Sequence, residues 1–181
     1  MKPSRRRTAL PPLDERRLNE LALRYVGRFA TTRAKLRSYL ARKLDERGWD
    51  GERDPDPEAI AERFAAQGYV DDSSYALAKS QSLTGRGYGK RRVVQALKAA
   101  GIDDEHGAAA HAHADDEAVS AALKFARRRR FGPFADSRPR DPRVEQKALA
   151  AMVRAGHGFE LARAILALPP GSEVDIDQLR R

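Results

Sequence analysis

Apolar residues recur at helical spacing along almost the whole chain, in short runs that end at glycine or proline. Between residues 18 and 29, apolar side chains fall three or four positions apart, so they share one face of a helix. The last such run, over 159–168, stops at Pro169-Pro170. Sustained alternation of apolar and polar residues, the pattern of half-buried strands, occurs nowhere. The sequence therefore predicts an all-α fold of short helices.

Several helix starts carry a specific signal. Asp56-Pro57 and Asp141-Pro142 each place an aspartate before a proline. The aspartate side chain accepts hydrogen bonds from unpaired backbone N–H groups, and proline at the first helical position loses no bond that would otherwise form. Further candidate caps are Thr31 or Thr32, Asp71 or Asp72, and Asp103.

The helices fall into a pattern that repeats three times. Gly48, Gly101 and Gly156 lie 53 and 55 residues apart, and a helix is expected after each. The residues four positions earlier are all apolar: Leu44, Leu97 and Met152. This spacing predicts divergent three-helix repeats that support one another, because a unit of about 50 residues is marginal alone. The expected divisions are a disordered basic arm (1–17), three repeats (18–70, 71–114 and 115–168) and a tail (169–181).

The composition excludes several classes of protein. The chain has no cysteine, which rules out disulfides, thiolate catalysis and Cys-ligated zinc. No window approaches the ~20 apolar residues of a membrane span, and the N-terminus lacks the apolar run of a signal peptide. We therefore expect a cytoplasmic protein without a membrane partner.

Candidate catalytic and metal-binding residues do not form a coherent site. His111 and His113 are two residues apart and point to different faces of a helix, so with His106 they make a poor metal site. The acidic pairs at 71–72, 103–104 and 115–116 lie where we expect helices to begin, and capping would account for them. We expect no catalytic residue, no metal and no cofactor.

The glycine-rich segment 85–89 resembles a phosphate-binding loop only loosely. Walker spacing is absent, and no strand precedes the segment, as a nucleotide site would require. We interpret it as a flexible connection between two helices.

Charge is strongly segregated along the chain, which has 35 Lys and Arg against 26 Asp and Glu. Residues 73–102 have a net charge of +6 and residues 118–135 a net charge of +5, and neither stretch contains an acid. Between them, 103–117 holds six acids and no Lys or Arg, while 45–72 has a net charge of −7. This distribution predicts a molecule with alternating basic and acidic bands, which favours a polyanionic partner.

The two basic bands contain the candidate DNA- or filament-binding residues. These are Arg86, Tyr88, Lys90, Arg91, Arg92, Lys98, Lys124, Arg127, Arg128, Arg129 and Arg130. Cations of this kind bind the phosphate backbone and release counterions. Tyr88 has two interpretations, an exposed base-stacking ring or a packing residue. The run 127–130 also fits a solvated helix end. No helix offers a clear base-reading row, although helix-turn-helix geometry stays open.

Two longer segments carry a resemblance to a known family. They are ALRYVGRFATTRAKLRSYLARKL and FAAQGYVDDSSYALAKSQSLTGRGYGKRRVVQALKAAGID. The most specific parts are Gly68-Tyr69-Val70-Asp71-Asp72 with Tyr75-Ala76, and Gly87-Tyr88-Gly89. Together they resemble the RecX regulatory proteins of bacteria, over about residues 18 to 168.

The resemblance implies an elongated, curved array of three tandem three-helix repeats. It implies a non-enzymatic modulator that binds RecA filaments and inhibits RecA ATP hydrolysis and strand exchange in recombination and the SOS response. Some family members also bind DNA directly. We expect a monomer that binds single- or double-stranded DNA with weak sequence specificity. The alternative is a stand-alone helical DNA-binding transcription factor, which would need sequence preference and a dimer.

Overall fold

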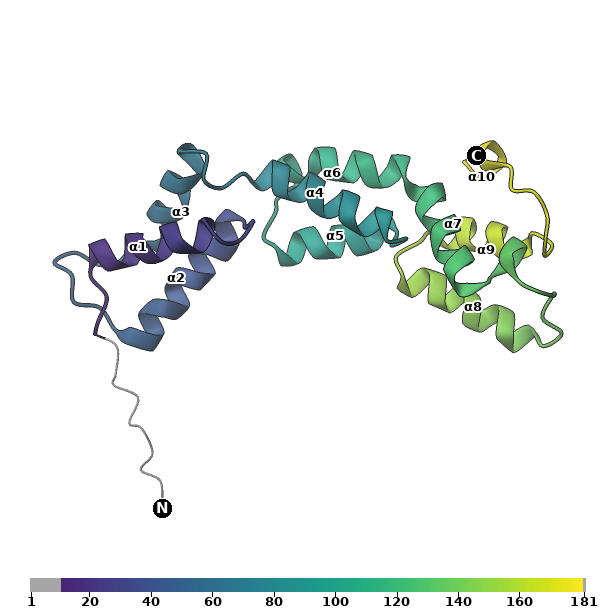
Figure 1. Cartoon of the computed structure of the whole chain (residues 1–181), viewed down its shortest axis with the longest axis horizontal. Coiled ribbons are helices and arrows are strands. Elements are labelled where there is room, and N and C mark those ends of the chain that lie inside the picture. The colour runs from purple at the N-terminus through teal and green to yellow at the C-terminus, as the bar shows by residue number, and fades with distance from the viewer. Residues whose placement is uncertain (1–10, 181) are drawn as a thin grey trace, which may run out of the picture. The chain divides into compact units, whose positions relative to one another are not determined.

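A computed structural model describes residues 11–180 (Figure 1). Its regular elements are all helical and the described part contains no strand, which confirms the predicted fold class. The helices group into two compact units, one that ends at Asp71 and one that begins at Asp72. Each unit is built around its own apolar side chains.

The first unit packs three helices around one core. They are α1 (Glu15–Val26), α2 (Arg33–Arg47) and α3 (Pro57–Ala66). Each contributes buried apolar side chains, such as Leu18, Leu40 and Phe64. Two predicted caps are confirmed: Thr32 accepts from the Lys35 N–H, and Asp56 accepts from the Ala59 N–H.

The N-terminal segment joins this core earlier than the sequence suggests. Residues 1–10 of the expected basic arm lie outside the described residues. The rest of the expected arm is structured, because α1 begins at Glu15 and Leu13 is fully buried. The Leu13 N–H donates to Gly48 O at 3.0 Å, and the Asp50 N–H donates to Leu13 O at 2.8 Å. An apolar residue directly before the capping Asp14 is therefore part of the core.

The second unit contains two groups of helices. The first group is α4 (Asp72–Gly85), α5 (Lys90–Ala99) and α6 (Asp104–Asp116). The second is α7 (Ala118–Arg129), the 3₁₀ turn η1 (Gly132–Phe134), α8 (Pro142–Arg154), α9 (Phe159–Ala167) and α10 (Ile176–Leu179). The predicted caps Asp103 and Asp141 are confirmed at α6 and α8. In the expected tail, Leu179 of α10 packs against the core of the second group.

The three glycines that define the repeat spacing all have a positive φ. Gly48, Gly101 and Gly156 have φ values of 78°, 73° and 98°. This left-handed region suits glycine, because a side chain there is strained. Each glycine follows a helix and redirects the chain. The division of the second unit into two repeats stays a prediction.

Candidate nucleic-acid interface

The candidate binding residues all lie on the second unit and are nearly all solvent-exposed. All ten cations are exposed, whereas Tyr88 is half-buried. Five of them, Arg86 and the run 127–130, lie at or just beyond the C-terminal ends of α4 and α7, and four lie on α5.

The glycine-rich turn between α4 and α5 is packed against other parts of the second unit. The interpretation of residues 85–89 as a flexible connection is therefore wrong. Gly87, with a φ of 80°, lies against α7: a Cβ there would stand 3.1 Å from Phe125 N. Gly89 lies against the turn after α8, where a Cβ would stand 2.3 Å from Gly156 O. Both glycines are buried. Their missing side chains allow backbone segments far apart in sequence to touch.

The same contact orients the start of α5. Gly89 provides no side-chain cap; instead, the Gly89 N–H donates to Ala155 O at 3.0 Å and the Arg91 N–H donates to Gly156 O at 3.1 Å. Unpaired N–H groups at a helix start require such acceptors. The backbone at Arg91 is therefore fixed while the Arg91 and Arg92 side chains extend into solvent.

The arginines that end α7 lie against aromatic rings. Their guanidinium carbons stand 4.8 Å (Arg127 to Phe134), 5.5 Å (Arg128 to Phe125) and 5.8 Å (Arg129 to Phe131) from the ring centroids. A cation over a ring face is attracted by its quadrupole. Arg128 Nη1 also donates to Arg86 O at 2.8 Å, which joins this group to the glycine-rich turn. These supporting phenylalanines were not predicted from the sequence as part of the site.

The acidic and basic bands are less separate in space than in sequence. Lys90 Nζ lies 2.6 Å from Asp115, and Lys124 Nζ lies 4.0 Å from Glu117. One lysine of each basic band therefore forms an ion pair with the acidic segment 103–117. Arg130 also has a partner, Asp136 at 3.6 Å. Within residues 11–180, the candidate cations without a carboxylate partner are Arg86, Arg91, Arg92, Lys98, Arg127, Arg128 and Arg129. We call these seven residues the arginine-rich surface.

Tyr88 packs between the two helix groups of the second unit. Its ring contacts the core of α4–α6 and the core of α7–α9, and the Arg86 guanidinium lies 5.4 Å from its centroid. The ring therefore has a packing role, and base stacking by Tyr88 stays a prediction.

His157 is buried behind the glycine-rich turn. It is 2% exposed, its ring lies 5.5 Å from that of Phe125, and Nε2 is 3.1 Å from Gly87 O. A carbonyl only accepts, so Nε2 carries the proton; Nδ1 has no hydrogen-bond partner among the described residues. Burial lowers the pKa of His157 below its usual 6.5, and the bond to Gly87 opposes this only in part.

Stability should therefore fall in mild acid. Because the pKa of His157 is lower in the folded state, the unfolded chain binds more protons at this residue below about pH 6.5. We expect the free energy of unfolding to fall by at most about 1.4 kcal/mol per pH unit there. His157→Gln keeps a donor for Gly87 but cannot take up a proton. Urea titrations across pH 5 to 8, roughly the range where histidine titrates, should show a shallower dependence for this variant; equal slopes would contradict the assignment.

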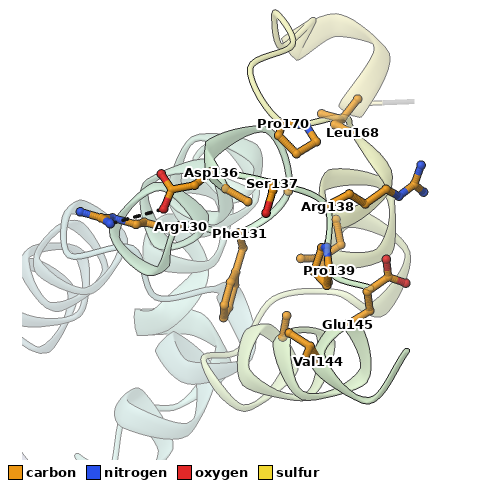
Figure 2. Close-up of a pocket in the computed structure, with 14 residues that line it drawn as sticks. Arg130, Phe131, Asp136, Ser137, Arg138, Pro139, Val144, Glu145, Leu168 and Pro170 are labelled. Atoms are coloured by element: carbon orange, nitrogen blue, oxygen red, sulfur yellow. Dashed lines mark ion pairs between the residues drawn. The ribbon is translucent and has the colours of Figure 1, made fainter. Parts of the chain in front are cut away.

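A separate hollow of about 250 Å³ opens near the end of α7 (Figure 2). Figure 2 shows Phe131 and Val144 on its walls and the Arg130–Asp136 ion pair at one side. Its lining includes two carboxylates, Asp136 and Glu145, and the hydroxyl of Ser137, but no histidine. One of the two carboxylates, Asp136, is held in the ion pair with Arg130.

The described residues also contain no group of three His, Asp or Glu side chains that could hold a metal ion. His106 is paired with Asp103 at 2.7 Å, and His113 Nε2 lies 3.2 Å from Thr84 Oγ1. Among the helices of residues 11–180, none combines the length and apolar character needed to span a membrane.

The fold and the arginine-rich surface together define the class of protein. It is a protein whose described part is all-helical, with exposed arginines at several helix ends. In sequence, the chain is 31% identical over 160 residues to the regulatory protein RecX of Myxococcus xanthus, across 84% of this chain and 86% of that protein. It is 29% identical over 175 residues to the RecX regulatory protein of Mycobacterium sp. strain KMS, across 94% and 93% of the two chains. No family model matches the chain.

A solved structure supports the same fold. The crystal structure of RecX from Lactobacillus salivarius matches with a TM-score of 0.59 and 18% sequence identity, over 83% of this chain and 92% of that one. With the sequence matches, this assigns the protein: the chain belongs to the RecX family of regulatory proteins.

Proposed function

We propose that this protein is a non-enzymatic cytoplasmic regulator that binds RecA filaments and inhibits RecA ATP hydrolysis and strand exchange. In this role it limits recombination and the SOS response. It contacts the DNA of the filament, or acidic parts of the filament protein, through the arginine-rich surface. Family membership supports the regulatory role, and the resemblance to RecX proteins supports RecA as the partner.

The observation that carries the DNA contact is the set of cations without carboxylate partners. A lysine held by a nearby carboxylate gains little from a phosphate, because that contact must first break. Arg91 and Arg92 have no such partner among the described residues, and the backbone beneath them is fixed by Gly156. Arginine also suits phosphate, because its planar fork donates two parallel hydrogen bonds.

Sedimentation with RecA filaments tests the proposal directly. RecA assembled on single-stranded DNA with a non-hydrolysable ATP analogue should carry the protein into the pellet, whatever the DNA sequence. An unrelated DNA sequence in excess should not release it, since electrostatic backbone contacts carry little sequence information. Failure to pellet with filaments, together with tight binding to one particular duplex sequence, would favour a transcription factor instead.

A further inference from the structure

The first unit carries a third basic stretch that lies outside the arginine-rich surface. Residues 21–44 contain seven Lys and Arg and no Asp or Glu. They span the second half of α1, the connection and most of α2. The cations are Arg24, Arg28, Arg33, Lys35, Arg37, Arg42 and Lys43.

Several of these cations form ion pairs within the first unit, so fewer of them are available to bind a phosphate. Arg33 lies 3.3 Å from Glu62, and Arg37 lies 2.5 Å from Glu58, so both hold α3. Glu46 lies 3.7 Å from Arg42 and 2.5 Å from Lys43. Arg24 and Arg28 have no carboxylate partner among residues 11–180. Both lie near the C-terminal end of α1.

An aromatic cluster occupies the same end of α1. The Tyr25 and Tyr39 rings are stacked, with centroids 4.2 Å apart and planes 12° apart, and join α1 to α2. Phe29 continues the cluster, with its centroid 5.4 Å from that of Tyr25. We call Tyr25, Phe29 and Tyr39 the aromatic ladder.

Phe29, the ring at one end of the aromatic ladder, is open to solvent and has a cation beside it. Phe29 is 53% exposed, and the Arg28 guanidinium lies 5.7 Å from its centroid. At the other end, Arg42 and Lys43 lie 5.7 and 5.9 Å from the Tyr39 centroid. An exposed phenylalanine contributes little to a core. Aromatic faces with adjacent cations are, however, the pattern that binds unpaired bases and their phosphates.

We propose that the aromatic ladder is a second nucleic-acid contact, where an unpaired base stacks on Phe29 and Arg28 binds an adjacent phosphate. The inference rests on the DNA contact in the proposed function and adds a preference for single strands. Duplex DNA keeps its bases stacked within the helix, so it offers no free face to Phe29. The arginine-rich surface supplies charge to both kinds of DNA, whereas the ladder distinguishes them.

Binding to two single-stranded oligomers of equal length, one of thymidines and one of abasic sites, separates stacking from charge. Fluorescence anisotropy at low salt gives the dissociation constants. The unaltered protein should bind the thymidine oligomer about tenfold more tightly than the abasic one, and Phe29→Ala should abolish that ratio while leaving abasic binding unchanged. Phe29→Trp should retain it. The matched control is Leu23→Ala, since Leu23 is 52% exposed on α1, just before the connection that holds Phe29, and belongs to no aromatic contact among the described residues.

The outcomes distinguish this inference from the proposed function. If the ratio of thymidine to abasic affinity is the same for the unaltered protein and Phe29→Ala, the aromatic ladder is not the stacking site. Stacking would then be assigned to another residue, such as Tyr88. An equal loss in Leu23→Ala would also overturn it, since any exposed apolar side chain in this part of the first unit would then have the same effect. If the unaltered protein binds neither oligomer, the DNA contact of the proposed function itself is wrong. Circular dichroism confirms that each variant is folded.

Discussion

Gly89→Ala should destabilise the second unit by about 3 kcal/mol, a large effect for one added methyl group. The reason is steric: the new Cβ would stand 2.3 Å from Gly156 O and 2.5 Å from His157 N. Both are backbone atoms, so no side chain can rotate away. Relief requires the start of α5 to move away from the turn after α8, which breaks the hydrogen bonds from Gly89 and Arg91.

A matched glycine in the same turn provides the control. A Cβ at Gly85 meets nothing within 4 Å, and this residue is the last of α4. Gly85→Ala should therefore be neutral or stabilise the protein by up to about 0.5 kcal/mol. Urea unfolding followed by circular dichroism measures both. The fluorescence of Trp49, the only tryptophan, reports the first unit and should keep its midpoint. Equal stability of the two variants would contradict the packed turn.

Reversing the charges of Arg91 and Arg92 should weaken binding to single-stranded DNA about 10- to 100-fold at low salt. Each lost contact to a single strand removes about 0.7 from the slope of log affinity against log salt concentration, so the slope should fall by about 1.4. The fold should survive, because glutamate is favourable at the start of a helix. Both side chains are exposed.

A control with the same change in net charge separates a local contact from general attraction. Arg143 and Lys147 lie on α8, are exposed and are outside the arginine-rich surface. Arg143→Glu with Lys147→Glu should change affinity much less and leave the salt slope nearly intact. If both double variants lose the same affinity, the attraction is general and the proposed contact at Arg91 and Arg92 is wrong.

Helix positions were predictable because their signals are local. Asp56-Pro57 and Asp141-Pro142 begin helices in the structure for the capping reason that the sequence gives. Gly48 and Gly101 end helices because only glycine readily adopts their positive φ. Such features depend on residues within one turn of each other, so the sequence contains the whole cause.

The character of the glycine-rich turn was not predictable in the same way. Its partner, His157, lies 70 residues from Gly87, and nothing local indicates that the two backbones touch. The pairing of Lys90 with Asp115 is also a tertiary contact, and it changes which cations are available. The role of the Gly-His-Gly segment at 156–158 likewise depends on a tertiary contact, the packing of the start of α5 against the turn after α8.

The rate of ATP hydrolysis by RecA on single-stranded DNA, in the presence of this protein, tests the central proposal most directly. With DNA in excess, so that competition for free DNA is negligible, amounts well below one protein per RecA should depress the rate. The double variant Arg91→Glu with Arg92→Glu should reach the same depression of the rate only at a higher protein concentration. A rate that stays unchanged up to equimolar protein would contradict the proposal that this chain restrains RecA filaments.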